Sequence, residues 1–179
     1  LRLTRLFGLP PRFPWAYGIL LISSMLIFSF SSFLLLFYPV SLFAPGFVEE
    51  RLTEQLLSVD TVAAELYRYL MLFVVLVFAP VAEEFVFRGV LLQRWAVRWN
   101  LPVGIILSSL LFGLLHINNP LGLTMFGVIM ALLYVRTRSL WVPIIAHALN
   151  NVISVLPELL ASSPQSFDIG DYQQTWWVG

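Results

Sequence analysis

Two adjacent carboxylates lie in an otherwise apolar stretch of this chain. Glu83 and Glu84 follow the apolar residues 71–82, and Arg88 comes one helical turn after Glu84. An ionised carboxylate near the centre of a bilayer costs at least about 2.5 kcal/mol, so two of them indicate a functional site. The two histidines of the chain, His116 and His147, fall in later apolar segments. Together these ionisable groups predict chemistry inside a membrane.

Helical spacing suggests different roles for these residues. Glu84 and Arg88 are four residues apart with the acid first, which is the favourable orientation for an ion pair. His147 and Asn151 are also four residues apart and would share one face of a helix. Glu83 lies about 100° around the helix from Glu84, so it can point elsewhere. We expect Arg88 to hold Glu84, which leaves Glu83 free to take a proton from water.

The residue types suit hydrolysis of an amide by activated water. Such a reaction needs an activated nucleophile and donors directed at the developing oxyanion. The chain has no cysteine, no lysine and no Gly-x-Ser-x-Gly elbow, so water is the expected nucleophile. A carboxylate desolvated in the membrane becomes a better base, and histidine and asparagine can donate to an oxyanion. A His-Glu-x-x-His zinc motif and a pair of membrane aspartates are both missing.

Three short motifs carry a resemblance to a known family. Residues 83–88 match Glu-Glu-x-x-x-Arg, residues 112–116 match Phe-x-x-x-His, and residues 147–151 match His-x-x-x-Asn. In this order on successive apolar helices, they resemble the CAAX-protease and bacteriocin-processing family of intramembrane glutamate proteases, also called CPBP or Abi. The resemblance covers about residues 67–155 and predicts a hydrolase that acts on peptide bonds.

The resemblance also implies a role at each matched position. Glu83 would be the general base, and His116 would help to bind and activate the water. His147 and Asn151 would stabilise the oxyanion. Glu84 and Arg88 would orient the site. The substrate would be a membrane-associated peptide or protein, with or without an attached lipid.

Two alternatives stay open at this point. Glu83, His116 and His147 also form a set of one carboxylate and two imidazoles that suits zinc. We favour no cofactor, because these residues lack the tight spacing of known zinc motifs and Asn151 is a poor zinc ligand but a good oxyanion donor. The second alternative is a non-enzymatic membrane protein, such as an immunity factor that binds its target.

Composition indicates an integral membrane protein. Hydrophobic residues make up 59% of the chain and charged residues 11%, whereas soluble domains carry about 25% charged residues. The net charge is zero and no basic face suits nucleic acid, so the lipid bilayer is the expected surrounding. We predict an all-α, multi-pass bundle in which residues 16–156 form one membrane-embedded domain. Residues 1–15 would be an N-terminal arm and residues 157–179 a polar tail.

About five spans are expected from the apolar stretches, since a spanning helix needs about 20 mostly apolar residues. Residues 44–66 mix leucines with acids and predict a helix on the membrane surface. Pro80 would break one helical hydrogen bond and free a backbone carbonyl. The expected spans are residues 16–43, 67–93, 101–118, 121–135 and 139–156, with the fourth the short one.

The arginines predict the orientation. With five spans, three clusters fall on one side of the membrane, and the acidic segments fall on the other. The positive-inside rule then places the N-terminus and the basic loops in the cytoplasm. We expect spans two, three and five to enclose a cavity that opens on this cytoplasmic side. The three clusters are Arg2, Arg5 and Arg12, then Arg94 and Arg98, then Arg136 and Arg138.

Overall fold

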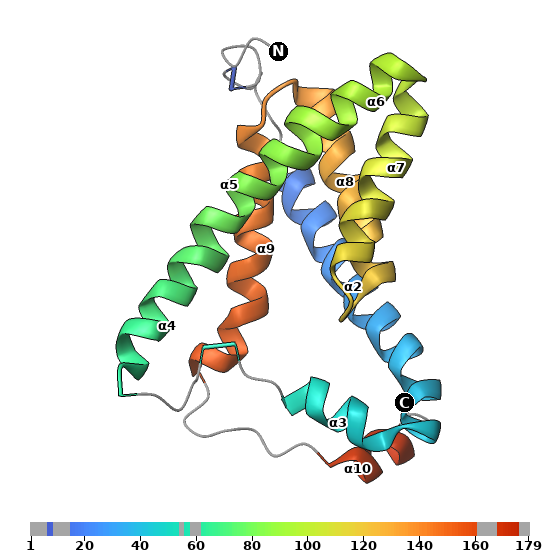
Figure 1. Ribbon diagram of the computed structural model, residues 1–179, viewed down its shortest axis with the longest axis vertical. Helices are drawn as coiled ribbons and strands as arrows, with labels where there is room; N and C mark the ends of the chain where they lie inside the picture. Colours follow the sequence, from blue (N-terminus) through green and yellow to red (C-terminus); the bar gives the residue numbers. More distant parts are fainter. Residues whose placement is uncertain (1–6, 9–14, 54–55, 58–61, 161–167, 176–179) are drawn as a thin grey trace.

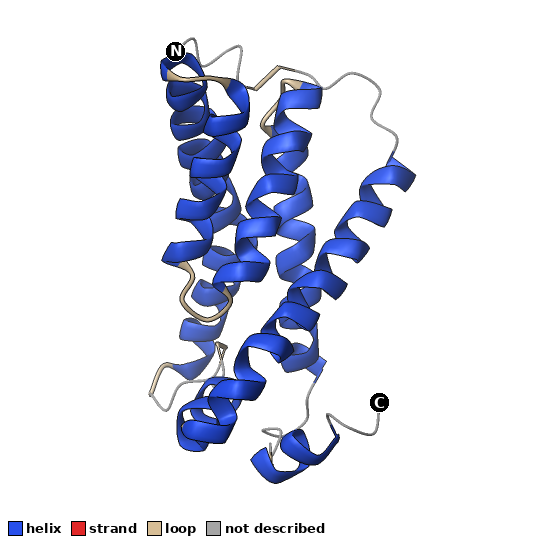
Figure 2. Cartoon of the chain, turned by 90° about the vertical axis from the view of Figure 1, so that its right-hand side faces the viewer, coloured by secondary structure: helices blue, strands red, loops and turns tan. Residues whose placement is uncertain are grey.

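The computed structural model describes residues 7–8, 15–53, 56–57, 62–160 and 168–175. In these parts the chain forms helices joined by short connections, without a strand (Figures 1 and 2). The all-α prediction is therefore confirmed. Arg2, Arg5 and Arg12 of the expected N-terminal arm lie outside the described residues. The helices are α2 (Trp15–Phe43), α3 (Pro45–Thr53), α4 (Ala64–Phe73), α5 (Ala79–Glu84), α6 (Gln93–Arg98), α7 (Leu101–Leu115), α8 (Pro120–Thr137), α9 (Trp141–Leu160) and α10 (Ile169–Thr175).

Four helical stretches are long and apolar enough to cross a membrane. They are Ala16–Phe43, Ala64–Arg98, Pro120–Thr137 and Trp141–Leu160, and α7 is a shorter apolar helix. We expected the fourth span to be the short one, but the third is. The reason lies in the residues after α7. Asn119 accepts a hydrogen bond from the Gly122 N–H and Pro120 is the first residue of α8, so a new helix must begin there.

The helix that carries the glutamates runs without interruption from α4 to α6 and contains two π-helical stretches. These are η1 (Val74–Phe78) and η2 (Phe85–Leu92), and they flank α5 on both sides. In η1 the Ala79 N–H donates to the Val74 carbonyl, five residues back. The next donor in this register is Pro80, which has no N–H. The Val75 carbonyl is therefore left without a helical partner, which agrees with the effect expected of Pro80.

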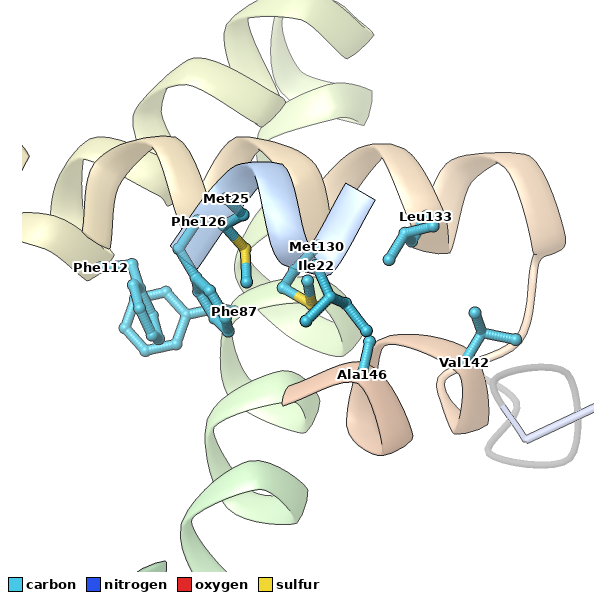
Figure 3. Close-up of a cluster of buried hydrophobic side chains, with 9 residues drawn as sticks. All are labelled: Ile22, Met25, Phe87, Phe112, Phe126, Met130, Leu133, Val142 and Ala146. Carbon is cyan, nitrogen blue, oxygen red and sulfur yellow. The ribbon is translucent and has the colours of Figure 1, made fainter. Parts of the chain in front are cut away.

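Besides a small cluster around Leu140 and Ile144, the helices pack around a main apolar core. Its buried side chains come from α2, η2, α7, α8 and α9, and Figure 3 shows that they converge between these helices. Small residues bring α7 and α8 close together: a Cβ at Gly127 would lie 2.9 Å from the Ser109 Cα. Close backbone approach of this kind is typical of packing between membrane helices. The core residues are Ile22, Met25, Phe87, Phe112, Phe126, Met130, Leu133, Val142 and Ala146.

The two ends of the bundle differ. α6 and the end of α8, with four of the arginines, lie at the top of Figure 1, and α3 and α10 lie at the bottom. α9 runs from top to bottom and continues to Leu160, beyond the expected start of the tail. α10 contacts α2 through the Tyr172 hydroxyl, which donates to the Leu34 carbonyl at 3.0 Å. The described part of the tail therefore includes a helix that packs against the bundle.

Candidate active site

Glu84 and Arg88 form an ion pair in the interior of the bundle, as their spacing predicted. Their side chains are 0% and 1% exposed, and Arg88 Nη1 donates to Glu84 Oε1 at 2.8 Å. Arg88 Nη2 donates to the Gly127 carbonyl at 3.1 Å. The guanidinium carbon lies 4.9 Å from the centre of the Phe112 ring. Arg88 thus links η2 to α7 and α8, and it compensates the charge of Glu84.

His147 from α9 contacts the same carboxylate. Its Nδ1 lies 2.9 Å from Glu84 Oε1, and the side chain is buried. That oxygen also accepts from Arg88 Nη1, and the carboxylate of this ion pair accepts the hydrogen of His147 Nδ1. This arrangement directs Nε2 of His147 toward Glu83 Oε2, at 3.8 Å. Glu84 therefore fixes both the orientation and the tautomer of the imidazole.

Glu83 points in a different direction from Glu84, as predicted. Its side chain is 29% exposed, and Oε2 lies 4.0 Å from His116 Nε2 in addition to its contact with His147. Among the described residues, none donates a hydrogen bond to this oxygen. Glu83 thus presents a carboxylate oxygen between two imidazole nitrogens, without the cation that neutralises Glu84.

The position of His116 differs from the expected one. We predicted that this residue would lie within the third span, but α7 ends at Leu115 and His116 is its non-helical C-cap, with φ −106° and ψ 75°. The ring is held by Nδ1, which lies 2.7 Å from the Phe112 carbonyl. A carbonyl can only accept, so Nδ1 carries the hydrogen and the lone pair of neutral His116 is on Nε2, which faces Glu83.

Asn151 connects α9 to the helical turn before the glutamates in which one backbone hydrogen bond is missing. Its Nδ2 donates to the Val75 carbonyl at 2.9 Å, which is the carbonyl that Pro80 leaves without a helical partner. Its Oδ1 accepts from Asn150 Nδ2 at 3.3 Å. An amide nitrogen carries two hydrogens, so one of them stays free for a ligand. Asn151 lines the same cavity as the glutamate and the histidines.

The cavity has a volume of about 340 Å³. It extends along α9 from His147 toward Glu158. In this direction α9 runs away from the end of the bundle that carries Arg94, Arg98, Arg136 and Arg138 (Figure 1). We expected it to open at the arginine-rich end, so the direction differs. Toward that end, α9 buries Val142, Ile144 and Ala146. The lining consists of Leu56, Val75, Ala79, Glu83, Phe112, His116, Leu123, Phe126, His147, Asn150, Asn151, Ser154, Val155 and Glu158.

Our reading of the sequence missed the polar residues beyond Asn151. Ser154 and Glu158 continue the face of His147 at helical spacing and line the cavity. Glu158 also accepts hydrogen bonds from the Leu57 N–H at 2.7 Å and the Leu56 N–H at 3.2 Å. A polar stripe along an otherwise apolar helix was the available signal. The backbone partners of Glu158 could not be foreseen, because the segment that provides them lies about 100 residues earlier.

A zinc ion can be tested against this geometry. Glu83 Oε2 and the two Nε2 atoms all bear lone pairs, so the donor types suit zinc. The Oε2–Nε2 separations of 3.8 and 4.0 Å exceed the spacing of roughly 3.3 Å that tetrahedral bonds of about 2 Å require. In the described part of the chain, no group of three or more His, Asp or Glu residues is arranged to hold a metal ion. The set therefore fits zinc in donor type but not in spacing.

Comparison with known proteins agrees with the motifs. The family model of the Rce1-like type II CAAX prenyl endopeptidases matches residues 65–153, the segment that contains Glu83, Glu84, Arg88, His116, His147 and Asn151. This membrane-embedded segment belongs to that family. The membrane-embedded CAAX protease MroQ of Staphylococcus aureus is 39% identical over 97 residues, 50% of this chain and 39% of that protein. YdiL of Bacillus subtilis, whose name describes a proposed membrane peptidase, is 34% identical over 92 residues, 50% of this chain and 38% of its own.

The family model matches about half of the chain. The chain spans less than two fifths of the length of both curated relatives. α2, α3 and α10 lie outside the segment that the Rce1-like family model matches. No solved structure matches the chain.

Proposed function

We propose that this chain is an intramembrane endopeptidase that cleaves a membrane-associated peptide with an activated water molecule. The observation that carries the proposal is the different state of the two glutamates. Glu84 is neutralised by a buried arginine, whereas Glu83 projects an oxygen without a hydrogen-bond donor into a cavity between two imidazoles. The names of the Rce1-like family and of both relatives support a peptidase.

His147 lies between the two carboxylates of the site. Its Nδ1 is 2.9 Å from Glu84 Oε1, and its Nε2 is 3.8 Å from Glu83 Oε2. In the proposed mechanism His147 donates from both ring nitrogens, and its Nε2 is directed at the cavity.

The reaction then follows from these positions. A water between Glu83 Oε2 and His116 Nε2 loses a proton to Glu83, and its oxygen attacks the carbonyl carbon of the substrate. The developing oxyanion accepts hydrogen bonds from His147 Nε2 and from the free amide hydrogen of Asn151. When the C–N bond breaks, the proton held by Glu83 passes to the leaving amine. Glu84 and Arg88 do not contact the substrate and position His147.

The shape of the cavity supports an extended, hydrophobic substrate. One wall is apolar, with Phe112, Leu123 and Phe126, and the facing wall is the polar stripe of α9. A peptide could place apolar groups on the first wall and its backbone along the second. Because the surrounding helices expose apolar side chains to lipid, such a peptide or its lipid would enter from the bilayer. A prenylated peptide end is the first substrate to test, since the family is named for it.

Cleavage by purified protein tests this function. The probe is an internally quenched peptide that ends in an S-farnesyl cysteine followed by three residues, compared with the same peptide without the farnesyl group. We expect cleavage by the wild type and at least about a 10³-fold loss in Glu83→Gln, because removal of the base removes water activation. Glu50→Gln, an exposed glutamate of α3, is the matched control and should cleave normally.

Mapping of new peptide ends in membranes of cells that carry the wild type or Glu83→Gln extends the test to unknown substrates. Equal cleavage by wild type and Glu83→Gln in both experiments would refute the mechanism. The absence of cleavage by either protein, with identical peptide ends in both membranes, would refute the peptidase and favour a binding protein.

The role of metal is tested on the same protein. We propose that enzyme treated with a chelator and stripped of metal keeps its activity, since the base and the oxyanion donors are all side chains. Loss of activity on stripping, restored by added zinc, would establish the alternative in which Glu83, His116 and His147 bind the ion. Stripped Glu50→Gln should behave as the stripped wild type does in either case.

A further inference from the structure

The side chain of Asn119 makes an unusual number of hydrogen bonds for a residue outside the three motifs. Its Nδ2 donates to the Ser29 carbonyl at 3.0 Å and to Ser29 Oγ at 2.9 Å. Its Oδ1 accepts from the Gly122 N–H at 3.0 Å and from Ser32 Oγ at 3.4 Å. One amide thus joins the loop between α7 and α8 to the middle of α2.

This loop is the one that carries His116. It is a tight turn in which the His116 N–H donates to the Gly113 carbonyl and the Asn119 N–H donates to the His116 carbonyl, at 3.0 and 3.1 Å. Because His116 is not inside a helix, the helical ladder does not fix its backbone. The Phe112 carbonyl holds Nδ1 of the ring, and the backbone that carries the ring depends on the turn, which Asn119 attaches to α2.

The surroundings of Asn119 are shaped to fit it. A Cβ at Gly122 would lie 2.5 Å from Asn119 Nδ2 and 2.7 Å from Ser29 Oγ, so only glycine leaves room for this pair. Ser32 is 4% exposed although it lies in an apolar helix. Buried polar groups of this kind are retained where they hydrogen-bond, because an unsatisfied one is costly. The space beside Gly122 and the hydrogen bonds to Ser29 and Ser32 therefore favour the same position of the Asn119 side chain.

We infer that Asn119 is a positioning residue: it ties the His116 turn to α2 and thereby holds His116 Nε2 opposite Glu83. The inference rests on the proposed function for its catalytic meaning. A water bridging the two groups must fit within their 4.0 Å separation, which leaves little tolerance. A misplacement of about 1 Å can cost about 100-fold in rate. The inference also gives α2, which lies outside the family match, a role in the site.

The state of His116 can be observed without any substrate. The chain has two histidines, so ¹⁵N-histidine NMR of the solubilised protein contains two imidazoles, and His116→Gln assigns them. In the wild type we expect His116 as the Nδ1–H tautomer, held by the Phe112 carbonyl. In Asn119→Ala its signals should move toward averaged tautomers, while those of His147 stay unchanged. Unchanged His116 signals in folded Asn119→Ala would overturn the inference.

A second experiment measures the kinetics of cleavage with the internally quenched farnesyl peptide. In Asn119→Ala we expect kcat to fall about 10- to 100-fold with KM within about twofold of the wild type. Asn118→Ala is the matched control, because Asn118 is the neighbouring asparagine, is exposed, and makes no side-chain hydrogen bond to the described residues. Asn119→Asp keeps the oxygen that Gly122 and Ser32 contact but loses the donor to Ser29, so its kcat should lie between those of the wild type and Asn119→Ala.

The outcomes separate the two proposals. If the wild type cleaves no peptide but the His116 signals respond to Asn119→Ala, the peptidase fails and the attachment of the turn stands. If Asn119→Ala loses only thermal stability, with normal kcat and unchanged His116 signals, the residue is structural and the inference fails. A rise in KM at constant kcat would also overturn it, because it would place Asn119 in substrate binding.

Discussion

The buried ion pair allows the structural role of Arg88 to be separated from its effect on the reaction. We consider Arg88→Met, which removes the charge and keeps much of the volume. With Nη1 and Oε1 at 2.8 Å, the attraction is about 6 kcal/mol at an effective dielectric constant of 20. Desolvation of the two ions offsets much of this. Removal of one partner leaves the other charge buried and alone, which costs about 3–5 kcal/mol.

A second substitution should recover most of that loss. In Arg88→Met combined with Glu84→Gln, neither buried group is charged. The remaining cost is the loss of the hydrogen bond to the Gly127 carbonyl, worth about 1 kcal/mol, and the replacement of a charged acceptor for His147 Nδ1 by an amide oxygen. We therefore expect the double variant to be about 1–3 kcal/mol more stable than Arg88→Met alone. Arg94→Met, at an exposed position of α6, is the control and should change stability by less than about 1 kcal/mol.

Activity should not recover with stability. A neutral amide at position 84 cannot stabilise an imidazolium at His147, so the double variant is expected to fold but to cleave the quenched peptide at least about 100-fold more slowly. Unfolding in detergent is followed by tryptophan fluorescence, and cleavage is measured on the same preparations. The reasoning is refuted if Arg88→Met is as stable as Arg94→Met, or if the double variant is no more stable than Arg88→Met.

Three further predictions use the absence of cysteine and one close helix contact. Val62, just before the long helix, and Val97, in its last turn, are both exposed. If the arginine-rich end faces the cytoplasm, a membrane-impermeant maleimide should label Val62→Cys in intact cells and Val97→Cys only after lysis. The thiol of Leu57→Cys should react slowly, since Leu57 is buried, and several-fold faster with Glu158→Ala, which removes the acceptor of its N–H; equal rates would contradict the contact. Gly113→Ala should lower the free energy of unfolding by about 1–3 kcal/mol, because its Cβ would meet the Thr124 side chain and the Pro120 carbonyl.

Local spacing was enough to predict the parts of the site that depend on one helix. The ion pair of Glu84 and Arg88 and the separate direction of Glu83 both follow from 3.6 residues per turn. The carbonyl freed by Pro80 follows from the missing N–H. These features need no information about neighbouring helices, and the structure contains each of them.

Features that depend on two distant segments could not be predicted in this way. Asn151 occupies the carbonyl of Val75, and Glu158 accepts from the backbone near Leu57. In both cases the partner lies on another element, and the order of residues along the chain does not show which residues of the two elements lie opposite each other. His116 shows a different limit: its apolar neighbours favoured a continuous span, whereas the Asn119 cap and Pro120 ended the helix.

The two histidines illustrate why contacts between elements decide the chemistry. Each uses Nδ1 as a donor, but His116 donates to a neutral carbonyl and His147 to a carboxylate. Nδ1 of His147 therefore faces an opposite charge, whereas Nδ1 of His116 faces only a dipole. The same residue type is thus suited to accept a hydrogen bond from water at one position and to donate to an oxyanion at the other. In the proposed mechanism Glu84 makes this difference, so it acts through His147.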